Sequence, residues 1–168
     1  VISKAMRLNP NMKYSVSLTT RSPRPGEIEG EDYFFVTDEY FSDMVEKGAM
    51  LEYACYVGNS YGTPQQAVED MLNEGRDVVL DIEVQGAAQV KMRKSEAVCI
   101  FLTPSSFGEL RRRLEGRGTE SAERIDGRIE RAREELCFVE NYDYIVINDD
   151  PDIAAGEICS IITAEKCR

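Results

Sequence analysis

Three short apolar runs, separated by stretches with helical periodicity, constrain the fold of this chain more than any other feature. They are DVVLDI (Asp77 to Ile82), VCIFL (Val98 to Leu102) and YIVIN (Tyr144 to Asn148). Continuous apolar strands are typical of a parallel sheet that is covered on both faces, and helices then connect the strands. Helical patterns are predicted near 86–93, 106–115, 121–140 and 151–165. The sequence therefore predicts an α/β fold with helices on both faces of a parallel sheet.

Turn and cap residues divide the first half of the chain into further elements. The clearest helix spans 64–74, where Thr63 is the expected N-cap, Gln66 completes a capping box with it, and Gly75 ends the helix. The other expected elements are a helix end at 3–8, strands over 14–19 and 33–36, and a helix from Thr37 or Asp38 to Lys47. The chain has no repeat or linker, so one domain is expected, with at most a small inserted lid.

The composition excludes several classes of function. The chain has no histidine, which removes the general base of Ser-His and Cys-His hydrolases, and its five cysteines lack the CxxC spacing of zinc sites. A net charge of −11 opposes the binding of polymeric nucleic acid, because phosphate backbones are repelled at long range. No apolar run is long enough for a membrane span and no export signal is recognised, so we expect no membrane partner and a cytoplasmic location.

The stretch from Thr19 to Glu27, TTRSPRPGE, carries two arginines between prolines. The prolines hold Ser22 and Arg24 extended, and a polyproline II repeat of three residues turns Arg21 and Arg24 toward the same side. Two converging guanidinium groups suit the bidentate binding of phosphate oxygens, and nearby hydroxyl groups add donors. The alternative interpretation is a solvated surface loop with Pro-Gly turns.

Polar residues follow two of the apolar runs, at the strand ends where parallel α/β sheets bind ligands. They are Asp81, Glu83, Asn148, Asp149 and Asp150. Together with Glu52 in MLEYA, Asp81 offers carboxylates that can accept hydrogen bonds from N1 and the 2-amino group of guanine, donors that adenine lacks. Taken alone, Glu52 also fits an exposed acidic residue after a helix turn.

A basic segment, ELRRRLEGRGTESAERIDGRIERAREE, supplies a third group of candidate residues. Arg113 lies near the end of one predicted helix, Arg128 lies on the next, and Arg117 lies in a glycine-flanked turn between them. A mobile basic turn can close over phosphates and neutralise the charge that develops during phosphoryl transfer. The alternative is a solvent-exposed helix face with Glu-Arg pairs.

Six motifs, in this order and at these spacings, make the chain resemble the guanylate kinase family of nucleoside monophosphate kinases, which transfer phosphate from ATP to GMP. They are TTRSPRPGEIEGEDYFFV, MLEYA, GNSYGT, LDIEVQGA, RRRLEGRGT and IVINDD. The resemblance covers nearly the whole chain. It implies a P-loop NTPase-like parallel sheet with flanking helices, an inserted GMP-binding region and a helical lid.

The resemblance also implies site residues, carried over position by position. The phosphate of GMP is expected to contact Ser17, Arg21, Arg24, Tyr33 and Tyr61. Guanine is expected to contact Glu52, Thr63 and Asp81. The catalytic arginines fall on Arg117, Arg128 and Arg113, and the residues near ATP are Asn148 and Arg117. Mg²⁺ is the implied cofactor, carried with ATP; no side chain is assigned to it, and Glu83 stands where the family often has Asp.

One part of the family pattern does not occur in this sequence. The family opens with an apolar strand and a Walker A loop of the form GxxGxGK[ST], whose backbone, lysine and hydroxyl hold the ATP phosphates and Mg²⁺. We expect about 20 further residues upstream of Val1 to supply it, and expect the chain without them to bind GMP but not to catalyse. The implied core is 1–15 with 77–168, including a lid over about 115–130, and the GMP-binding region is 16–76.

Two other functions remain open from the sequence. One is a non-catalytic guanylate-kinase-like module that binds phosphopeptides, which the missing Walker A loop favours. The retained family residues oppose it; they are Ser17, Glu52, Asp81, Arg117 and Arg128. The other is a sugar-phosphate kinase of the same superfamily, for which carboxylates that read guanine have no use. The oligomeric state and the use of deoxy-GMP are also left open.

Overall fold

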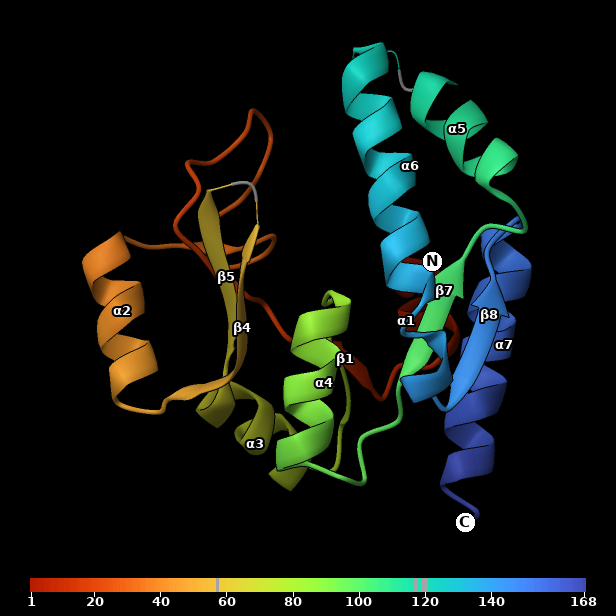
Figure 1. Ribbon diagram of the computed structural model, residues 1–168. Coiled ribbons are helices and arrows are strands. Elements are labelled where there is room, and N and C mark those ends of the chain that lie inside the picture. Colours follow the sequence, from red (N-terminus) through yellow and green to blue (C-terminus); the bar gives the residue numbers. More distant parts are fainter. Residues whose placement is uncertain (57, 117, 119–120) are drawn as a thin grey trace. The chain divides into compact units, whose positions relative to one another are not determined.

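The computed structural model describes residues 1–56, 58–116, 118 and 121–168. Within these residues the chain forms two compact units, which are described separately below (Figure 1). One unit consists of Pro10–Ala97, and the other consists of Val1–Asn9 together with Val98–Arg168. The division drawn from the sequence, with boundaries after residues 15 and 76, separates regions by expected role and stays a prediction.

The unit formed by Pro10–Ala97 contains two sheets and three helices among its described residues. Its strands are β1 (Met12–Tyr14), β2 (Leu18–Thr19), β3 (Phe34–Phe35), β4 (Met50–Tyr56), β5 (Asn59–Pro64) and β6 (Asp77–Val79). Its helices are α2 (Asp38–Glu46), α3 (Gln65–Asn73) and α4 (Val84–Arg93). β1 pairs in parallel with β6, and the second sheet has the order β3-β2-β5-β4. Within that sheet β4 and β5 form an antiparallel hairpin (Figure 1).

The other unit is formed mainly by helices around one parallel strand pair. β7 (Ile100–Thr103) pairs in parallel with β8 (Tyr144–Ile147). Its helical elements are α1 (Ile2–Leu8), α5 (Phe107–Gly116), α6 (Ala122–Leu136), the 3-10 helix η1 (Val139–Asn141) and α7 (Pro151–Glu165). Among the described residues no helix combines the length and the apolar character that crossing a membrane requires.

Strand β4 is anchored by two apolar cores, because successive side chains of a strand point to opposite faces. On one side lies a cluster of Leu18, Phe41 and Met50, from β2, α2 and β4. On the other side lies a cluster of Leu51, Val68 and Val90, from β4, α3 and α4. Met50 and Leu51 are each 1% exposed, so both faces of the strand are fully packed at this point. The hairpin that carries Glu52 is therefore fixed from both sides.

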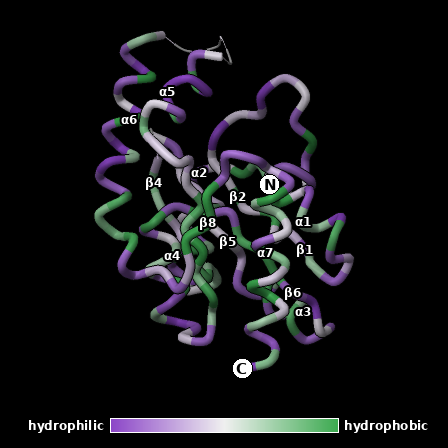
Figure 2. Tube along the Cα trace, turned by 90° about the vertical axis from the view of Figure 1, so that its right-hand side faces the viewer, coloured by the Kyte–Doolittle hydropathy of each residue, from purple (hydrophilic) through white to green (hydrophobic). Residues whose placement is uncertain are grey.

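In the other unit, small residues let α1 lie directly against α7. Ala5, Ala154 and Ala155 are fully buried, and the Lys4 ammonium donates to the Asp152 carboxylate at 2.6 Å. A separate cluster of Leu114, Ile125 and Ile129 joins α5 to α6. Along α6, hydrophobic residues recur among hydrophilic ones, as expected for an amphipathic helix (Figure 2).

The structure confirms the α/β architecture with parallel strands and corrects several predicted elements. The strand predicted over 14–19 is interrupted, since β1 ends at Tyr14 and β2 begins at Leu18. The Ser15 N–H donates to the Val79 carbonyl, whereas the Ser17 carbonyl accepts from the Phe34 N–H. The chain thus leaves one sheet and enters the other within three residues, and this segment cannot form one continuous strand.

The predicted capping box at the start of α3 is wrong. Pro64 is the N-cap of this helix, and Thr63 belongs to β5, where it pairs with Glu52 of β4. The Thr63 hydroxyl donates to the Glu52 carboxylate, and the Gln66 side chain donates to Asp70. A buried carboxylate thus competes successfully with the helix for the threonine side chain.

The apolar runs are less covered than the sequence predicts, and two strands of the four-stranded sheet were not predicted. Leu102, Ile145 and Ile147 of the β7–β8 pair are 41%, 57% and 45% exposed, so complete burial of both faces is wrong for this unit as described. The β4–β5 hairpin was not predicted, and the interpretation of Glu52 as an exposed acidic residue after a helix turn is wrong. Glu52 lies inside a strand and is 4% exposed.

Candidate functional site

The loop that follows β2 is organised by Glu27. One oxygen of its carboxylate accepts from Arg21 Nη2 at 2.8 Å, and the other accepts from Arg21 Nη1 at 3.0 Å and from the Arg24 N–H at 2.7 Å. Hydrogen bonding to Arg21 lowers the pKa of Glu27 and raises the pKa of Arg21. Arg24 itself is exposed. One carboxylate therefore fixes the Arg21 side chain and the backbone at Arg24 together.

Aromatic rings complete the surroundings of Arg21. Its guanidinium carbon lies 5.4 Å from the ring centroid of Tyr33 and 5.8 Å from that of Phe35. Tyr61 lies edge-on to Tyr33, with 5.9 Å between the centroids, and a hydrogen bond with Tyr61 also raises the pKa of Arg21. The rings and the bidentate carboxylate restrict the rotamers of a side chain that is otherwise flexible. The structure thus brings Arg21, Tyr33 and Tyr61 together, and their contact with the phosphate of GMP stays a prediction.

Buried hydroxyl groups tie the start of this loop to the neighbouring strand. Thr19 is fully buried; its hydroxyl donates to the Ser60 carbonyl at 3.0 Å and accepts from the Arg21 N–H at 3.2 Å. In return, the Ser60 N–H donates to the Thr20 hydroxyl at 3.0 Å. Ser17 is 8% exposed and lies just before β2. The loop therefore emerges from a rigid strand end, which is what a binding group needs for precise placement.

Glu52 is a buried carboxylate with a dedicated hydrogen-bond donor. The β4–β5 register places it opposite Thr63, which is fully buried and donates to Glu52 Oε1 at 2.6 Å. Burial raises the pKa of Glu52, and the charge of Glu83 adds to this, whereas hydrogen bonds from Thr63 oppose it. A carboxylate held in this way can accept strong hydrogen bonds from a ligand that brings N–H donors.

Asp81 follows β6 and is exposed, and its charge acts on the half-buried Tyr14. Burial and the nearby charge of Asp81 raise the pKa of Tyr14 to about 12. The Tyr14 hydroxyl therefore stays protonated over the physiological pH range and remains a hydrogen-bond donor. Tyr33 also contributes to this shift, so Tyr14, Tyr33 and Asp81 share one neighbourhood. Tyr14 is not among the site residues predicted from the sequence, where it is expected only to begin a strand.

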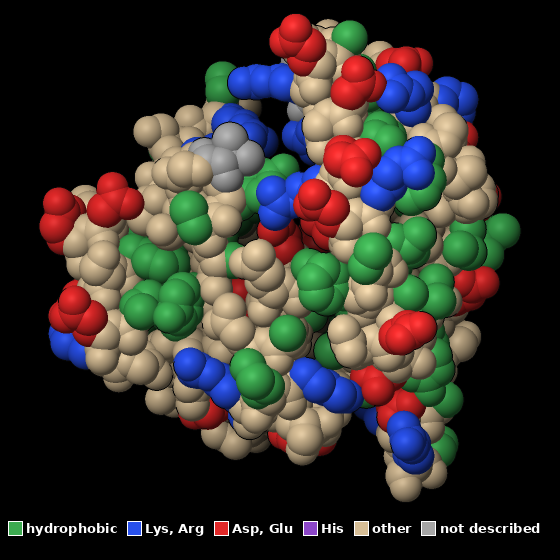
Figure 3. All heavy atoms as spheres, viewed as in Figure 1, with side chains coloured by type: hydrophobic (Ala, Val, Ile, Leu, Met, Phe, Trp, Pro, Cys, Tyr) green, Lys and Arg blue, Asp and Glu red, His purple; other side chains and the backbone are tan. Residues whose placement is uncertain are grey.

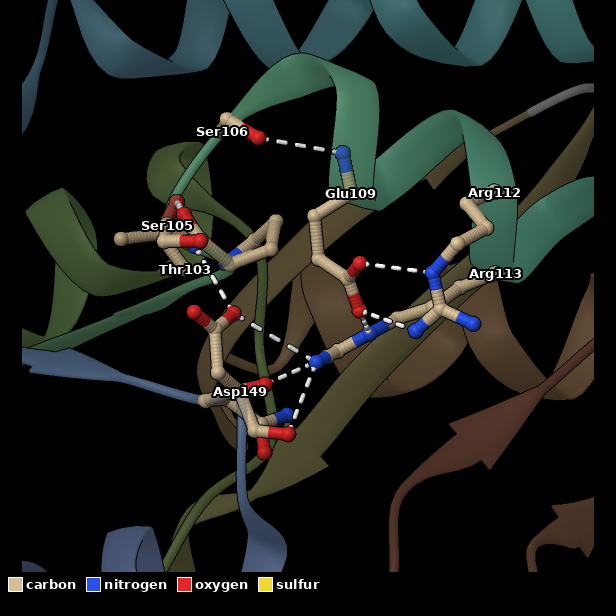
Figure 4. Close-up of polar contacts among 9 residues, drawn as sticks. Thr103, Ser105, Ser106, Glu109, Arg112, Arg113 and Asp149 are labelled. Atoms are coloured by element: carbon tan, nitrogen blue, oxygen red, sulfur yellow. Dashed lines mark hydrogen bonds and ion pairs between the residues drawn. The ribbon is translucent and has the colours of Figure 1, made fainter.

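In the other unit, Arg113 links α5 to the segment after β8 (Figure 4). Its guanidinium donates to the Glu109 carboxylate, to the Asn148 carbonyl and to the Asp149 carbonyl, the last at 3.1 Å. Asp149 in turn accepts from the Ser105 N–H at 3.0 Å. Hydrogen bonds from Arg112 and then from Arg113 lower the pKa of Glu109 to about 2. Arg113 therefore ties α5 to the segment after β8, and its catalytic role stays a prediction.

The remaining candidates in this unit are only partly described. Arg128 lies on α6, and Arg117 lies outside the described residues. Acidic and basic side chains alternate over α5 and α6 (Figure 3), and Arg111 pairs with Asp126 across the two helices at 2.5 Å. The Asn148 side-chain oxygen is buried and has no hydrogen-bond partner among the described residues. It is an acceptor that a ligand can satisfy.

The described side chains do not form a preorganised metal cage. In the part of the chain that the structure describes, no group of three or more His, Cys, Asp or Glu side chains is placed to hold a metal ion. Mg²⁺ commonly retains waters and binds through one or two carboxylates together with substrate phosphates.

Comparison with known proteins places the chain in a class and then in a family. Parallel strand pairs with flanking helices define an α/β protein, and the fold superimposes with a TM-score of 0.83 on the crystal structure of guanylate kinase from Anaplasma phagocytophilum. That alignment has 36% sequence identity and covers 99% of this chain and 81% of the other. Residues 4–165 match the family model described as guanylate kinase. The chain belongs to the guanylate kinase family.

Curated relatives agree with this assignment. A guanylate kinase from Lactococcus lactis subsp. lactis is 52% identical over 168 residues, covering 100% of this chain and 82% of the relative. A guanylate kinase from Streptococcus thermophilus is 54% identical over 156 residues, covering 93% of this chain and 75% of the relative. The resemblance seen in the six motifs is thereby confirmed at the level of the family.

Sequence reasoning missed the residues that hold the predicted ligand contacts in place. Glu27 and Gly86 are examples: both stand inside quoted motifs, yet neither was selected. The acidic residue six positions after Arg21 was a usable signal, because it is the one carboxylate within TTRSPRPGE. Gly86 lies beside the carboxylate of Glu52, on the distant strand β4, and its own sequence neighbourhood carries no sign of that proximity.

Proposed function

We propose that the intact protein catalyses the transfer of the terminal phosphate of ATP to GMP, giving ADP and GDP. The observation that carries the proposal is the buried Glu52 carboxylate, held by Thr63 in the same unit as Arg21, Tyr33 and Tyr61. It supplies an acceptor for guanine in the unit that also supplies phosphate-binding groups. The family assignment and the names of the curated relatives support the same reaction.

In the proposed acceptor site, two sets of groups divide the recognition of GMP. The phosphate is bound by charged and hydroxyl groups from Ser17, Arg21, Arg24, Tyr33 and Tyr61. The base is read by Glu52, Thr63 and Asp81. Guanine offers N–H donors at N1 and at the 2-amino group, whereas adenine offers no such pair. Binding adenine would leave a buried carboxylate without ligand donors, and this penalty discriminates strongly between the two purines.

In the proposed donor site, the protein acts through position and charge. The unpartnered Asn148 oxygen suits the exocyclic amino group of adenine, and Arg113 holds the backbone that carries Asn148. Arg117 and Arg128 are proposed to neutralise charge on the transferred phosphoryl group. Mg²⁺ arriving with ATP would offset negative charge on the phosphates, and no described side chain is assigned to hold it. No general base of the histidine type is required for such a reaction.

The reaction belongs to purine nucleotide metabolism, and we propose the cytoplasm as its location because both substrates are dissolved nucleotides. The proposed roles follow the division of the chain into a GMP-binding region at 16–76, a core and a lid near 115–130. Closure of the lid on binding is part of the proposal.

Isothermal titration calorimetry with GMP, AMP and a phosphoserine peptide tests the proposal. We expect GMP alone to bind, and expect Glu52→Gln to weaken GMP binding without creating a site for AMP. The exposed Glu46→Gln is the matched control for the change in charge. Binding of the peptide in place of GMP would identify a non-catalytic interaction module, and equal binding of GMP and AMP would overturn the reading of guanine by Glu52.

A further inference from the structure

Gly86 packs against the carboxylate of Glu52 at an unusually short range. It lies in the first turn of α4 and is buried. A Cβ atom at Gly86 would lie 2.4 Å from Glu52 Oε2 and 3.1 Å from Glu52 Cδ. The carboxylate thus occupies space that any other residue at this position would fill. Its second oxygen, Oε1, accepts the hydrogen bond from Thr63 at 2.6 Å.

Backbone conformation does not explain a glycine at this position. Gly86 is helical and is not among the glycines with positive φ, so an L-residue could adopt its conformation without strain. Within a helix, glycine is the least favourable residue apart from proline. The contact with Glu52 is the feature that a larger side chain would disturb.

We propose that Gly86 is a specificity-determining positioning residue, which makes the space in which the Glu52 carboxylate faces guanine. The proposal rests on the proposed function, in which Glu52 reads the base. With Thr63 on one oxygen and Gly86 beside the other, the carboxylate is confined from both sides. The purine preference therefore depends on a helix residue that is not itself among the proposed contacts with GMP.

The same geometry indicates which atoms move when a side chain is added at Gly86. Ordinary van der Waals contact with a Cβ begins at 3.4 Å, so Oε2 has to move by about an ångström. Oε2 is at the end of a flexible side chain and can move. The Ile82 Cβ would lie 3.3 Å from the added Cβ and has to shift only slightly. The fold can therefore tolerate alanine, and the displacement falls on the group that reads the base. A misplacement of about an ångström at a reacting or recognising group lowers activity by up to about 100-fold.

The test compares Gly86→Ala with a matched control and with Glu52→Gln. We expect Gly86→Ala to weaken GMP binding by about 10- to 100-fold in calorimetry and to raise KM for GMP more than it lowers kcat. Gly156→Ala, in α7, is the control because nothing described lies within 4 Å of its added Cβ. This control is expected to bind GMP like the wild type.

The outcomes separate this inference from the proposed function. If Glu52→Gln weakens GMP binding while Gly86→Ala keeps wild-type affinity, the role of Gly86 is overturned and the proposed function stands. If Glu52→Gln binds GMP as tightly as the wild type, the proposed function fails in its reading of the base.

A second variant covers the case in which Gly86→Ala lowers the melting temperature. The double variant Gly86→Ala with Glu52→Asp shortens the carboxylate and removes the contact, so thermal stability should return while GMP affinity stays low. A double variant that remains as unstable as Gly86→Ala would show that the added methyl group disturbs something other than Glu52, and would overturn the inference.

Discussion

Replacing Thr63 by valine removes the hydroxyl that donates to Glu52 and keeps the shape of the side chain. Thr63 is fully buried, Glu52 is 4% exposed, and the hydrogen bond between them is 2.6 Å long. A hydrogen bond to a charged acceptor contributes about 1.5–3 kcal/mol, and the orphaned carboxylate has little access to water. For a chain of 168 residues, this loss corresponds to a fall in Tm of about 3–12 °C.

The loss of stability caused by Thr63→Val should increase with pH. Burial raises the pKa of Glu52 in the folded state. The contribution of Glu52 to stability is therefore greatest below its pKa in the unfolded chain, and it is lost as pH rises through its pKa in the folded protein. The hydrogen bond from Thr63 opposes that rise, and removing it moves the pKa of Glu52 further upward. The difference in Tm between variant and wild type should therefore be larger at about pH 8 than at about pH 5.5.

Thermal unfolding followed by circular dichroism measures both effects. Thr163→Val is the control, because its hydroxyl donates to the Cys159 carbonyl on an exposed part of α7 and its loss is expected to change stability by less than about 0.5 kcal/mol. In a background of Glu52→Gln, the effect of Thr63→Val should shrink, since the charge that the hydroxyl stabilises is gone. Equal Tm values for Thr63→Val and wild type at both pH values would refute the reasoning.

Three further predictions address other parts of the structure. Glu27→Gln should raise KM for GMP more than it lowers kcat, because Arg21 loses its charged partner; steady-state kinetics test this, and an unchanged KM would contradict it. Arg113→Ala should raise KM for ATP by loosening the backbone at Asn148, and an equal rise in KM for GMP would argue against a local effect. Met50→Ala should lower the free energy of unfolding by about 2–5 kcal/mol in urea titration, because Met50 is 1% exposed; a loss below about 1 kcal/mol would contradict tight packing there.

Local signals in the sequence predicted those elements whose chemistry is local. Glycines at helix ends are an example: Gly48 and Gly75 both have positive φ, at 66° and 74°, directly after α2 and α3. The helix predicted near 151–165 is observed as α7, which Asp150 caps and Pro151 starts. In these cases the residues that determine the element are its own neighbours.

Sequence patterns gave wrong predictions where a contact with a distant residue determines which element or hydrogen bond a residue forms. Thr63 carries the pattern of a helix cap, yet its hydroxyl bonds to Glu52 eleven residues earlier in the chain. The β4–β5 hairpin was missed because its strands show no clear alternation; each face of β4 packs on a different core. The family resemblance supplied the candidate contact residues, but a neighbour such as Gly86, which lies beside the Glu52 carboxylate, appears only when the folded contacts are known.

The pairing of Arg21 with Glu27 has a consequence for how a phosphate would be attracted. Arg21 already has an internal counterion, and the whole chain carries a net charge of −11, so little long-range attraction toward an anion remains. If Arg21 binds the phosphate of GMP, affinity has to come from short-range complementarity between the guanidinium fork and the phosphate oxygens. Ionic strength should then alter GMP affinity less than it would at a site with uncompensated arginines, and anions of the wrong geometry gain little from charge alone.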